Sequence, residues 1–235
     1  MSKFTYMKKQ IFFLLVILMV IPIGIQAQDT AFQEFRKEAE DYSMIYSGET
    51  VTIYSKFHYF NLPYWETEEY RNGTLCYEGR IYKDVPLRYD LFQNKLNILL
   101  PKRIGVYVDS RKVNYFILND VLFVPYEKGY QQILHNSNYL KLTSIVNCIF
   151  GNEIQEGIHS FKNFIFKEQY TLAIDGKEYD IKNRKAFIKC FPAYKKQLKK
   201  YAKEHNLDFK NDRKHAFIAL TQYTETLIKA DQHEK

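Results

Sequence analysis

The sequence predicts a mainly β (α+β) protein, in which an antiparallel up-and-down β-meander is followed by helices. Short runs of alternating apolar and polar residues recur between residues 49 and 181, separated by turns of two or three residues. Strands joined so tightly pair as antiparallel neighbours, because a parallel crossover needs about a dozen residues or more. Helical spacing and positive charge come together only after residue 181. We therefore expect a curved sheet or incomplete barrel, with a short N-terminal helix and two C-terminal helices.

Residues 1–27 are predicted to be an export signal. Three lysines precede an apolar run from Ile11 to Ile25, and Ile25-Gln26-Ala27 fits a cleavage site before Gln28. Because Pro22 and Gly24 interrupt the run, it is short for a membrane span of roughly 20 residues, although an uncleaved anchor is the alternative. No later apolar run is long enough to cross a bilayer, so we expect no transmembrane segment after signal removal.

The first elements of the mature chain are a helix, a strand and a loop. Ala31–Tyr42 has apolar residues at helical spacing, and Glu49–Phe57 alternates as a strand does. The loop from Asn61 to Glu66 contains Pro63, which cannot donate a hydrogen bond to a central ladder.

The clearest local signal is the stretch Gly73–Asp90. Two alternating runs, Thr74–Tyr77 and Ile81–Tyr89, flank Glu78-Gly79, and Gly79 can adopt the positive φ of a tight hairpin turn. We expect a second turn at Lys83-Asp84.

Further short strands follow the hairpin. They are predicted at Val85–Phe92, Leu96–Leu100, Ile104–Val108, Val113–Leu118, Val121–Tyr126, Tyr130–His135, Leu140–Val146, Phe161–Phe166, Tyr170–Ile174 and Glu178–Ile181. Gly151–His159 is predicted to be a long loop.

Residues 182–235 form a basic helical segment that we expect to pack on itself or on the sheet. One helix should follow Pro192 and bury Tyr194, Leu198 and Tyr201, and a second should follow a cap at Asp208 or Asn211. The β domain, residues 28–181, carries 17 basic and 21 acidic residues, a net charge of −4. Residues 182–235 carry 14 and 6, a net charge of +8, so the positive charge belongs to one segment.

An ordered set of motifs resembles a family of exported Bacteroidota proteins that has no assigned activity. Its most specific parts are the hairpin Gly73-x-Leu75-x-Tyr77-x-Gly79 and the strand Val85-Pro86-Leu87-Arg88-Tyr89-Asp90, before a Lys-rich helical end. Tyr46-Ser47-Gly48, Pro63-Tyr64 and Tyr82 also fit. His135–Asn138 departs from the family's Asp-Gly turn. The resemblance implies a location in the envelope of a Gram-negative cell and supplies no catalytic residues.

The sequence argues against an enzyme. No nucleophile, zinc-protease or phosphate-loop motif occurs, and the six histidines are scattered without ligand spacing. We therefore predict no catalytic residue, no metal site and no cofactor. Cys76, Cys148 and Cys190 lie far apart in the sequence, and we favour three buried thiols over a disulfide with one thiol left over.

Eight residues are candidate binding residues. Tyr64 and Trp65 could present exposed rings to a glycan or peptide, although core packing is the favoured interpretation. Arg88 and Asp90 could clamp a ligand, although a cross-strand ion pair is favoured. Lys195, Lys196, Lys199 and Lys200 could attract anionic lipid or lipopolysaccharide, or could form a solvated face. Export makes a nucleic-acid partner improbable.

We therefore predict a non-enzymatic, exported envelope protein, periplasmic or associated with the outer membrane, that acts as a binding or assembly module. Its partner is expected to be another envelope protein or an anionic lipid surface. A periplasmic carrier of an apolar ligand in an open β-groove is the alternative, and an enzyme acting on a glycan or peptide is the second alternative.

Overall fold

The computed structural model describes residues 43–46, 48–100, 103–127 and 129–233. The chain divides into two compact units, 1–47 and 48–235, and the fold below is that of the second unit. The predicted signal segment and the predicted helix Ala31–Tyr42 lie outside the described residues. In the first unit, the described residues form a turn in which the Tyr46 amide donates to the Ser43 carbonyl.

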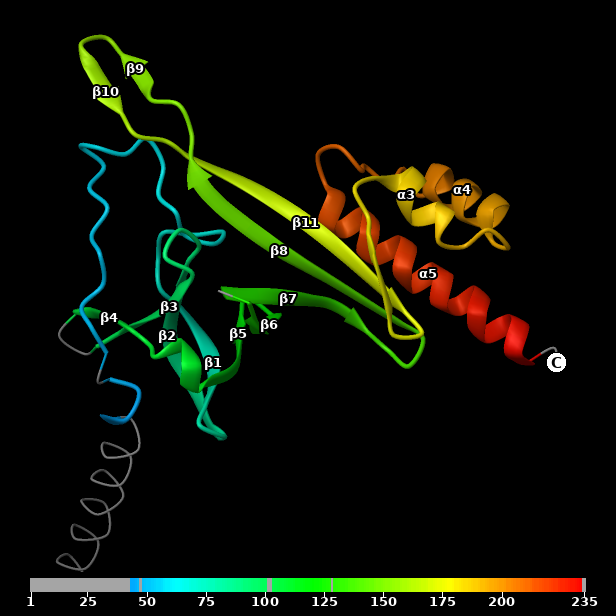
Figure 1. Ribbon diagram of the computed structural model, residues 1–235, viewed down its shortest axis with the longest axis horizontal. Coiled ribbons are helices and arrows are strands. Elements are labelled where there is room, and N and C mark those ends of the chain that lie inside the picture. The colour runs from blue at the N-terminus through cyan, green and yellow to red at the C-terminus, as the bar shows by residue number, and fades with distance from the viewer. Residues whose placement is uncertain (1–42, 47, 101–102, 128, 234–235) are drawn as a thin grey trace, which may run out of the picture. The chain divides into compact units, whose positions relative to one another are not determined.

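One ten-stranded antiparallel sheet dominates the second unit (Figure 1). Its strands, in chain order, are β1 (Arg71–Tyr77), β2 (Arg80–Asp90), β3 (Lys95–Leu99), β4 (Gly105–Tyr107), β5 (Val113–Leu118), β6 (Val121–Tyr126), β7 (Gly129–Asn136), β8 (Leu140–Phe150), β11 (Phe164–Ile174) and β12 (Lys177–Asp180). In space they follow the order β12-β11-β8-β7-β6-β5-β1-β2-β3-β4, so the sheet has two ends and does not close into a barrel. The predicted mainly β, antiparallel class is confirmed.

The chain departs from strict neighbour order at one place, between β4 and β5. A short 3₁₀ helix, η1 (Ser110–Lys112), carries the chain back from the β4 edge, and β5 then pairs with β1. This pairing places Phe116 of β5 opposite Leu75 of β1, so two buried apolar side chains meet. The sheet is therefore two meanders, β1–β4 and β5–β12, joined through the β1–β5 pair.

The prediction of a strand at Glu49–Phe57 is wrong. Within it, only Thr50 forms a β-bridge, to Val106 of β4, and the side chains of Ile53 and Phe57 are 85% and 87% exposed. Since β4 has three residues, its edge is too short to pair with a longer strand. The Thr52 amide donates to the Tyr107 hydroxyl instead of to a backbone carbonyl.

Besides shifts of up to four residues at strand ends, three other predictions differ from the structure. Lys83-Asp84 is a bulge within the continuous strand β2 and not a turn, because Gly73 pairs with Val85 while Leu75 pairs with Tyr82. The predicted loop Gly151–His159 contains most of a small hairpin, formed by β9 (Ile154–Glu156) and β10 (His159–Phe161). The strand predicted at Phe161–Phe166 is divided, because Phe161 ends β10 and Phe164 begins β11. β11 continues through the strand predicted at Tyr170–Ile174 and pairs with β8 along its whole length.

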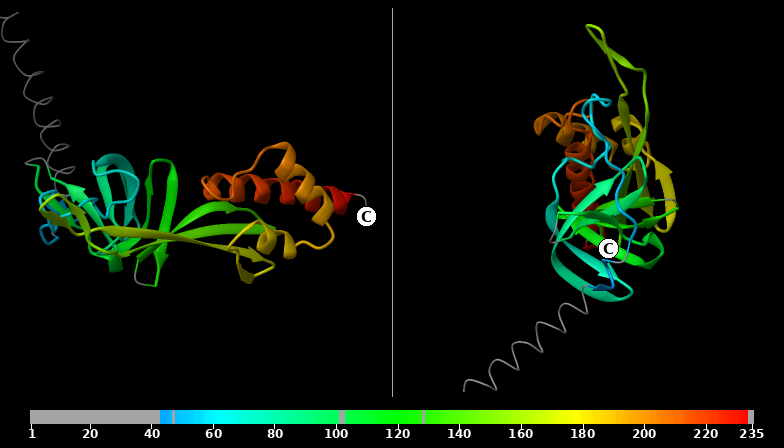
Figure 2. Two further views of the ribbon diagram at one scale, coloured as in Figure 1. Left: turned by 90° about the horizontal axis from the view of Figure 1, so that it is seen from above. Right: turned by 90° about the vertical axis from the view of Figure 1, so that its left-hand side faces the viewer.

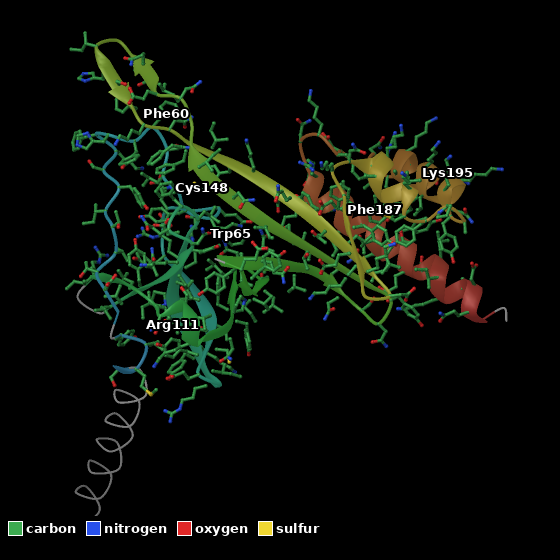
Figure 3. All side chains as sticks on the ribbon, viewed as in Figure 1. Phe60, Trp65, Arg111, Cys148, Phe187 and Lys195 are labelled. Carbon is green, nitrogen blue, oxygen red and sulfur yellow. The ribbon has the colours of Figure 1, made fainter. Side chains whose placement is uncertain are left out.

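Aromatic rings fill the core beside β1–β7. The Tyr89 ring contacts Phe116, Phe123 and Tyr130 edge-on, and Phe116 stacks on Phe123 with ring centroids 4.5 Å apart. Trp65 meets Phe123 edge-to-face at 4.9 Å, which is the geometry that aromatic quadrupoles favour. The side chain of Trp65 lies among these strands in Figure 3.

The C-terminal segment contains α3 (Arg184–Lys189), α4 (Lys195–Glu204) and α5 (Arg213–His233). The helices α4 and α5 confirm the two predicted helices, whereas α3 is an additional helix, capped by the Asn183 side chain. The buried side chains Phe187, Leu198, Phe217 and Leu220 pack with Leu142 and Leu172 of the sheet. Figure 2 shows the three helices gathered beside one end of the sheet. None of the helices in the described residues combines the length and the apolarity that crossing a membrane would require.

Candidate functional site

The eight candidate residues fall into two separate places and the core. Tyr64, Arg88 and Asp90 lie together beside β2, and the four lysines lie on α4. Trp65 is only 4% exposed and belongs to the core, in agreement with core packing, the favoured interpretation of this ring. Tyr64 is 8% exposed, so the pair does not form an exposed platform of rings.

Backbone pairing explains why Tyr64 and Trp65 separate. Tyr64 bridges Asp90, the Trp65 amide donates to the Tyr89 carbonyl, and the Leu91 amide donates to the Pro63 carbonyl. This segment thus runs beside the end of β2 as a strand does, and successive side chains of a strand point to opposite faces. Trp65 therefore joins the core, while Tyr64 lies on the other face of the sheet with Arg88.

Arg88 is held between two tyrosine rings. Its guanidinium carbon lies 3.8 Å from the Tyr64 ring centroid and 4.2 Å from the Tyr70 ring centroid. One terminal nitrogen donates to the Glu68 carbonyl at 2.9 Å, and the other donates to the Tyr70 hydroxyl at 3.2 Å. Stacking and hydrogen bonding in the plane together fix a guanidinium group.

Asp90 lies two residues further along the same face and is fully buried. It accepts hydrogen bonds from the Tyr54 hydroxyl at 3.0 Å and from the amides of Phe92 and Gln93 at 3.0 and 2.9 Å. The predicted cross-strand ion pair is thus replaced by stacking at Arg88 and by neutral donors at Asp90.

Burial sets the protonation of the groups around Arg88. It raises the pKa of Tyr64 to about 12, although the nearby Arg88 charge opposes the shift. Burial also raises the pKa values of Tyr54 and Tyr70, so all three hydroxyls are neutral at pH 7 and can donate hydrogen bonds. The pKa of Asp90 is raised because desolvation outweighs the donated hydrogen bonds.

The second place is a surface that we call the basic face. It consists of ten exposed side chains on α3, α4 and the adjoining loops: Lys182, Arg184, Lys185, Lys189, Lys195, Lys196, Lys199, Lys200, Lys203 and Lys210. The same stretch of chain contains two acidic residues, Glu204 and Asp208. Among the ten described cations, Lys200 alone lies within ion-pair distance of a carboxylate, that of Glu204 at 3.8 Å. Figure 3 labels Lys195, which extends outward from α4.

The basic face is held in place by the core beneath it. Leu198 and Ala202 of α4 are buried, and Tyr201 stacks on Tyr223 of α5 with ring centroids 4.0 Å apart. Charged residues therefore occupy the outer side of α4, while its apolar side is fixed to α5.

A hollow of about 820 Å³ lies within the basic face. Arg184 and Lys185 of α3, Lys203 of α4 and Lys210 of the following loop all line it. Asp208, the one acidic residue among the described residues of the lining, accepts hydrogen bonds from the amides of Lys210 and Asn211. Its carboxylate is thus engaged within its own loop, and the cations determine the charge that the hollow presents.

The four candidate lysines of α4 belong to the basic face, but none of them is among the residues that line the hollow. The α3 helix has six residues, which is too short for helical periodicity to reveal it, so Arg184 and Lys185 were not placed beside α4. The net charge of the whole segment was the available signal. Within the described residues, no three His, Cys, Asp or Glu side chains converge in a way that could hold a metal ion.

Searches with this chain against protein-family models, curated proteins and solved structures returned no match.

Proposed function

We propose that this protein is a non-enzymatic, exported envelope protein that binds anionic lipid head groups through its basic face. The observation that carries the proposal is the concentration of ten exposed cations on α3, α4 and their adjoining loops, a stretch of chain that contains two acidic residues. A solvated face that served only solubility would not need so strong an excess of one sign.

The energetics of such a surface are sufficient for reversible attachment. Each Lys or Arg close to an anionic bilayer contributes about 1 kcal/mol, and this attraction falls off within a Debye length. That length is about 10 Å at 0.1 M salt and about 3 Å at 1 M salt. Attachment through the basic face should therefore be strong at low ionic strength and should weaken steeply as salt is added.

The hollow favours the binding of individual phosphate-bearing head groups, in addition to a general attraction to a negatively charged surface. Four cations from three successive segments converge around it, so one phosphate group could contact side chains from more than one helix. Such a contact would add specificity for a charged group that projects from the surface, since lysines act as point charges that bind phosphate well. The predicted export signal would deliver the protein to a compartment bounded by such surfaces.

Vesicle flotation tests the proposal. The mature chain should float with vesicles that contain phosphatidylglycerol and should stay unbound with vesicles of phosphatidylcholine alone. The variant Lys195→Glu/Lys196→Glu/Lys199→Glu/Lys200→Glu should lose at least about tenfold in affinity, because four attractive charges become repulsive.

The matched control changes the net charge equally but in the β domain, with Arg80→Glu/Lys162→Glu/Lys167→Glu/Lys177→Glu, all of them exposed positions. This variant should retain most of its binding. Equal loss in both variants, equal binding to neutral vesicles, or binding that does not change with salt would refute the proposal.

A further inference from the structure

A second cavity, independent of the basic face, lies against the sheet at β2–β4. It has a volume of about 460 Å³ and is lined by residues of β2–β4 on one side and by residues 50–54, Leu62, Tyr64 and Tyr70 on the other. Cavities of roughly 300–1,000 Å³ hold small organic ligands in proteins. The cavity opens onto the face of the sheet that carries Arg88, away from the ring core around Tyr89.

The lining of this cavity combines apolar walls with two cations. Val51, Leu62, Leu99 and Ile104 supply aliphatic surface, and the charged side chains in the lining are Arg88 and Arg103. No acidic residue is among the described residues that line it. Asp90 does not line the cavity, and its carboxylate accepts hydrogen bonds from the Tyr54 hydroxyl and from the amides of Phe92 and Gln93. The unbalanced charge of the cavity wall is therefore positive.

Arg88 is prepared to receive an anion. The two tyrosine rings and the Glu68 carbonyl fix the plane of its guanidinium group, so little side-chain freedom would be lost when a ligand binds. Its Nε atom is buried and has no hydrogen-bond partner among the described residues. That atom is closed to solvent, so a bound carboxylate would accept instead from the terminal nitrogens, each of which has a second N–H beside the one donated to the Glu68 carbonyl or the Tyr70 hydroxyl.

Gly105 also lines this cavity. A Cβ atom at this position would lie 2.3 Å from the Tyr70 hydroxyl and 2.8 Å from a methyl group of Val51. The absence of a side chain thus lets Tyr70 and Val51 approach β4, where both line the cavity.

We propose that this cavity binds an anionic amphiphile, a molecule with one carboxylate head group and an apolar chain. The carboxylate pairs with Arg88 and is attracted by Arg103, and the chain lies against the aliphatic wall. The basic face takes no part in this site, so the proposal does not depend on the lipid-surface function.

Isothermal titration calorimetry with decanoate, below its micelle concentration, tests the site. Decanoate should bind with a stoichiometry of one. Decanol, which lacks the charge, and decyltrimethylammonium, which reverses it, should each bind at least about tenfold more weakly, because hydrogen bonds to a charged group contribute strongly. The absence of saturable decanoate binding, or equal binding of decanol, would overturn the proposal.

Three matched Arg→Gln variants locate the site. Arg88→Gln should weaken decanoate binding by about tenfold or more, and Arg103→Gln, at an exposed position, by about two- to fivefold. Arg111→Gln is the control, because Arg111 lies on η1, pairs with Asp109 and does not line the cavity. If Arg88→Gln does not fold, as judged by circular dichroism, Arg103→Gln decides the result. Unchanged decanoate affinity in Arg103→Gln, or an equal loss in Arg111→Gln, would refute the assignment.

Discussion

The carboxylate of Asp90 accepts hydrogen bonds that stabilise the fold, although burying its charge costs free energy. Three donors hold its carboxylate, yet desolvation raises its pKa above that of an ordinary aspartate. A folded-state pKa above the unfolded value means that folding favours the protonated form. The contribution of this group to stability is therefore greatest below the unfolded pKa, and it is lost as pH rises through the folded pKa.

Two substitutions at Asp90 separate the hydrogen bonds from the charge. Asp90→Ala should lower the free energy of unfolding by about 1–3 kcal/mol, because it leaves the Tyr54 hydroxyl and two amides without an acceptor. Asp90→Asn keeps polar atoms in place without the charge, so at pH 7 it should match or exceed the wild type. As pH falls towards 4, the wild type should gain stability relative to Asp90→Asn. Urea unfolding at several pH values measures these differences, and equal, pH-independent losses in both variants would contradict this account.

At the scale of single elements, β2 owes its length to a bulge. Lys83 and Asp84 together oppose Thr74 of β1, and Asp84 has a φ of 54° in the left-handed region. That region costs most L-residues roughly 1–2 kcal/mol, although Asn and Asp tolerate it better. The bulge keeps Val85, Leu87 and Tyr89 directed into the core beyond it.

Substitutions at Asp84 test the cost of this backbone conformation. Asp84→Val should lower the free energy of unfolding by about 1–2 kcal/mol, since a β-branched residue fits the left-handed region poorly. Asp84→Asn should stay within about 0.5 kcal/mol of the wild type, because an exposed, tolerant residue replaces another. Denaturant unfolding of the two variants provides the comparison. A valine variant as stable as the asparagine variant would show that the bulge rearranges without cost.

The elements also show what local sequence can and cannot predict. Alternation predicted β5 and β6 at their observed bounds, because the turn at Asn119-Asp120 separates them clearly in the sequence. The same alternation failed at Glu49–Phe57, where the neighbouring edge strand is too short to pair with it. No local pattern shows that β5 returns to β1, since that pairing depends on residues about 40 positions apart in the chain.

The two candidate sites also differ in how far the sequence predicts them. The lysines of α4 were predictable because charge and helical spacing are properties of one segment. The residues that surround Arg88 were not predictable, because Tyr64 and Tyr70 contact it from a loop that has no periodic sequence pattern. The pairing of Tyr64 with Asp90 places that loop, and it exists only once β2 has formed.

For the molecule as a whole, the three cysteines indicate a fold without cross-links. All three are free thiols in the described structure, but of the three that were predicted to be buried only Cys76 is, whereas Cys148 and Cys190 are partly buried. Cys76 lies on β1 beside Asn114, Cys148 packs beside the ring of Phe164, and Cys190 packs with the helical core. β1 and β8 are separated by three strands in the sheet, and Cys190 follows α3, so each thiol belongs to a different part of the fold. A disulfide requires Cα atoms within about 7 Å of each other.

Alkylation under non-reducing conditions should therefore label all three cysteines in the unfolded chain. In the native protein, labelling at Cys148 should be slow, because burial raises its pKa to about 12 and leaves almost no thiolate at neutral pH. Burial also raises the pKa of Cys190, so it too should react slowly. Mass spectrometry counts the labels before and after unfolding, with a reduced sample as the control. A single label on the unfolded, non-reduced chain would reveal a disulfide and would mean that two of these parts lie closer together than the structure places them.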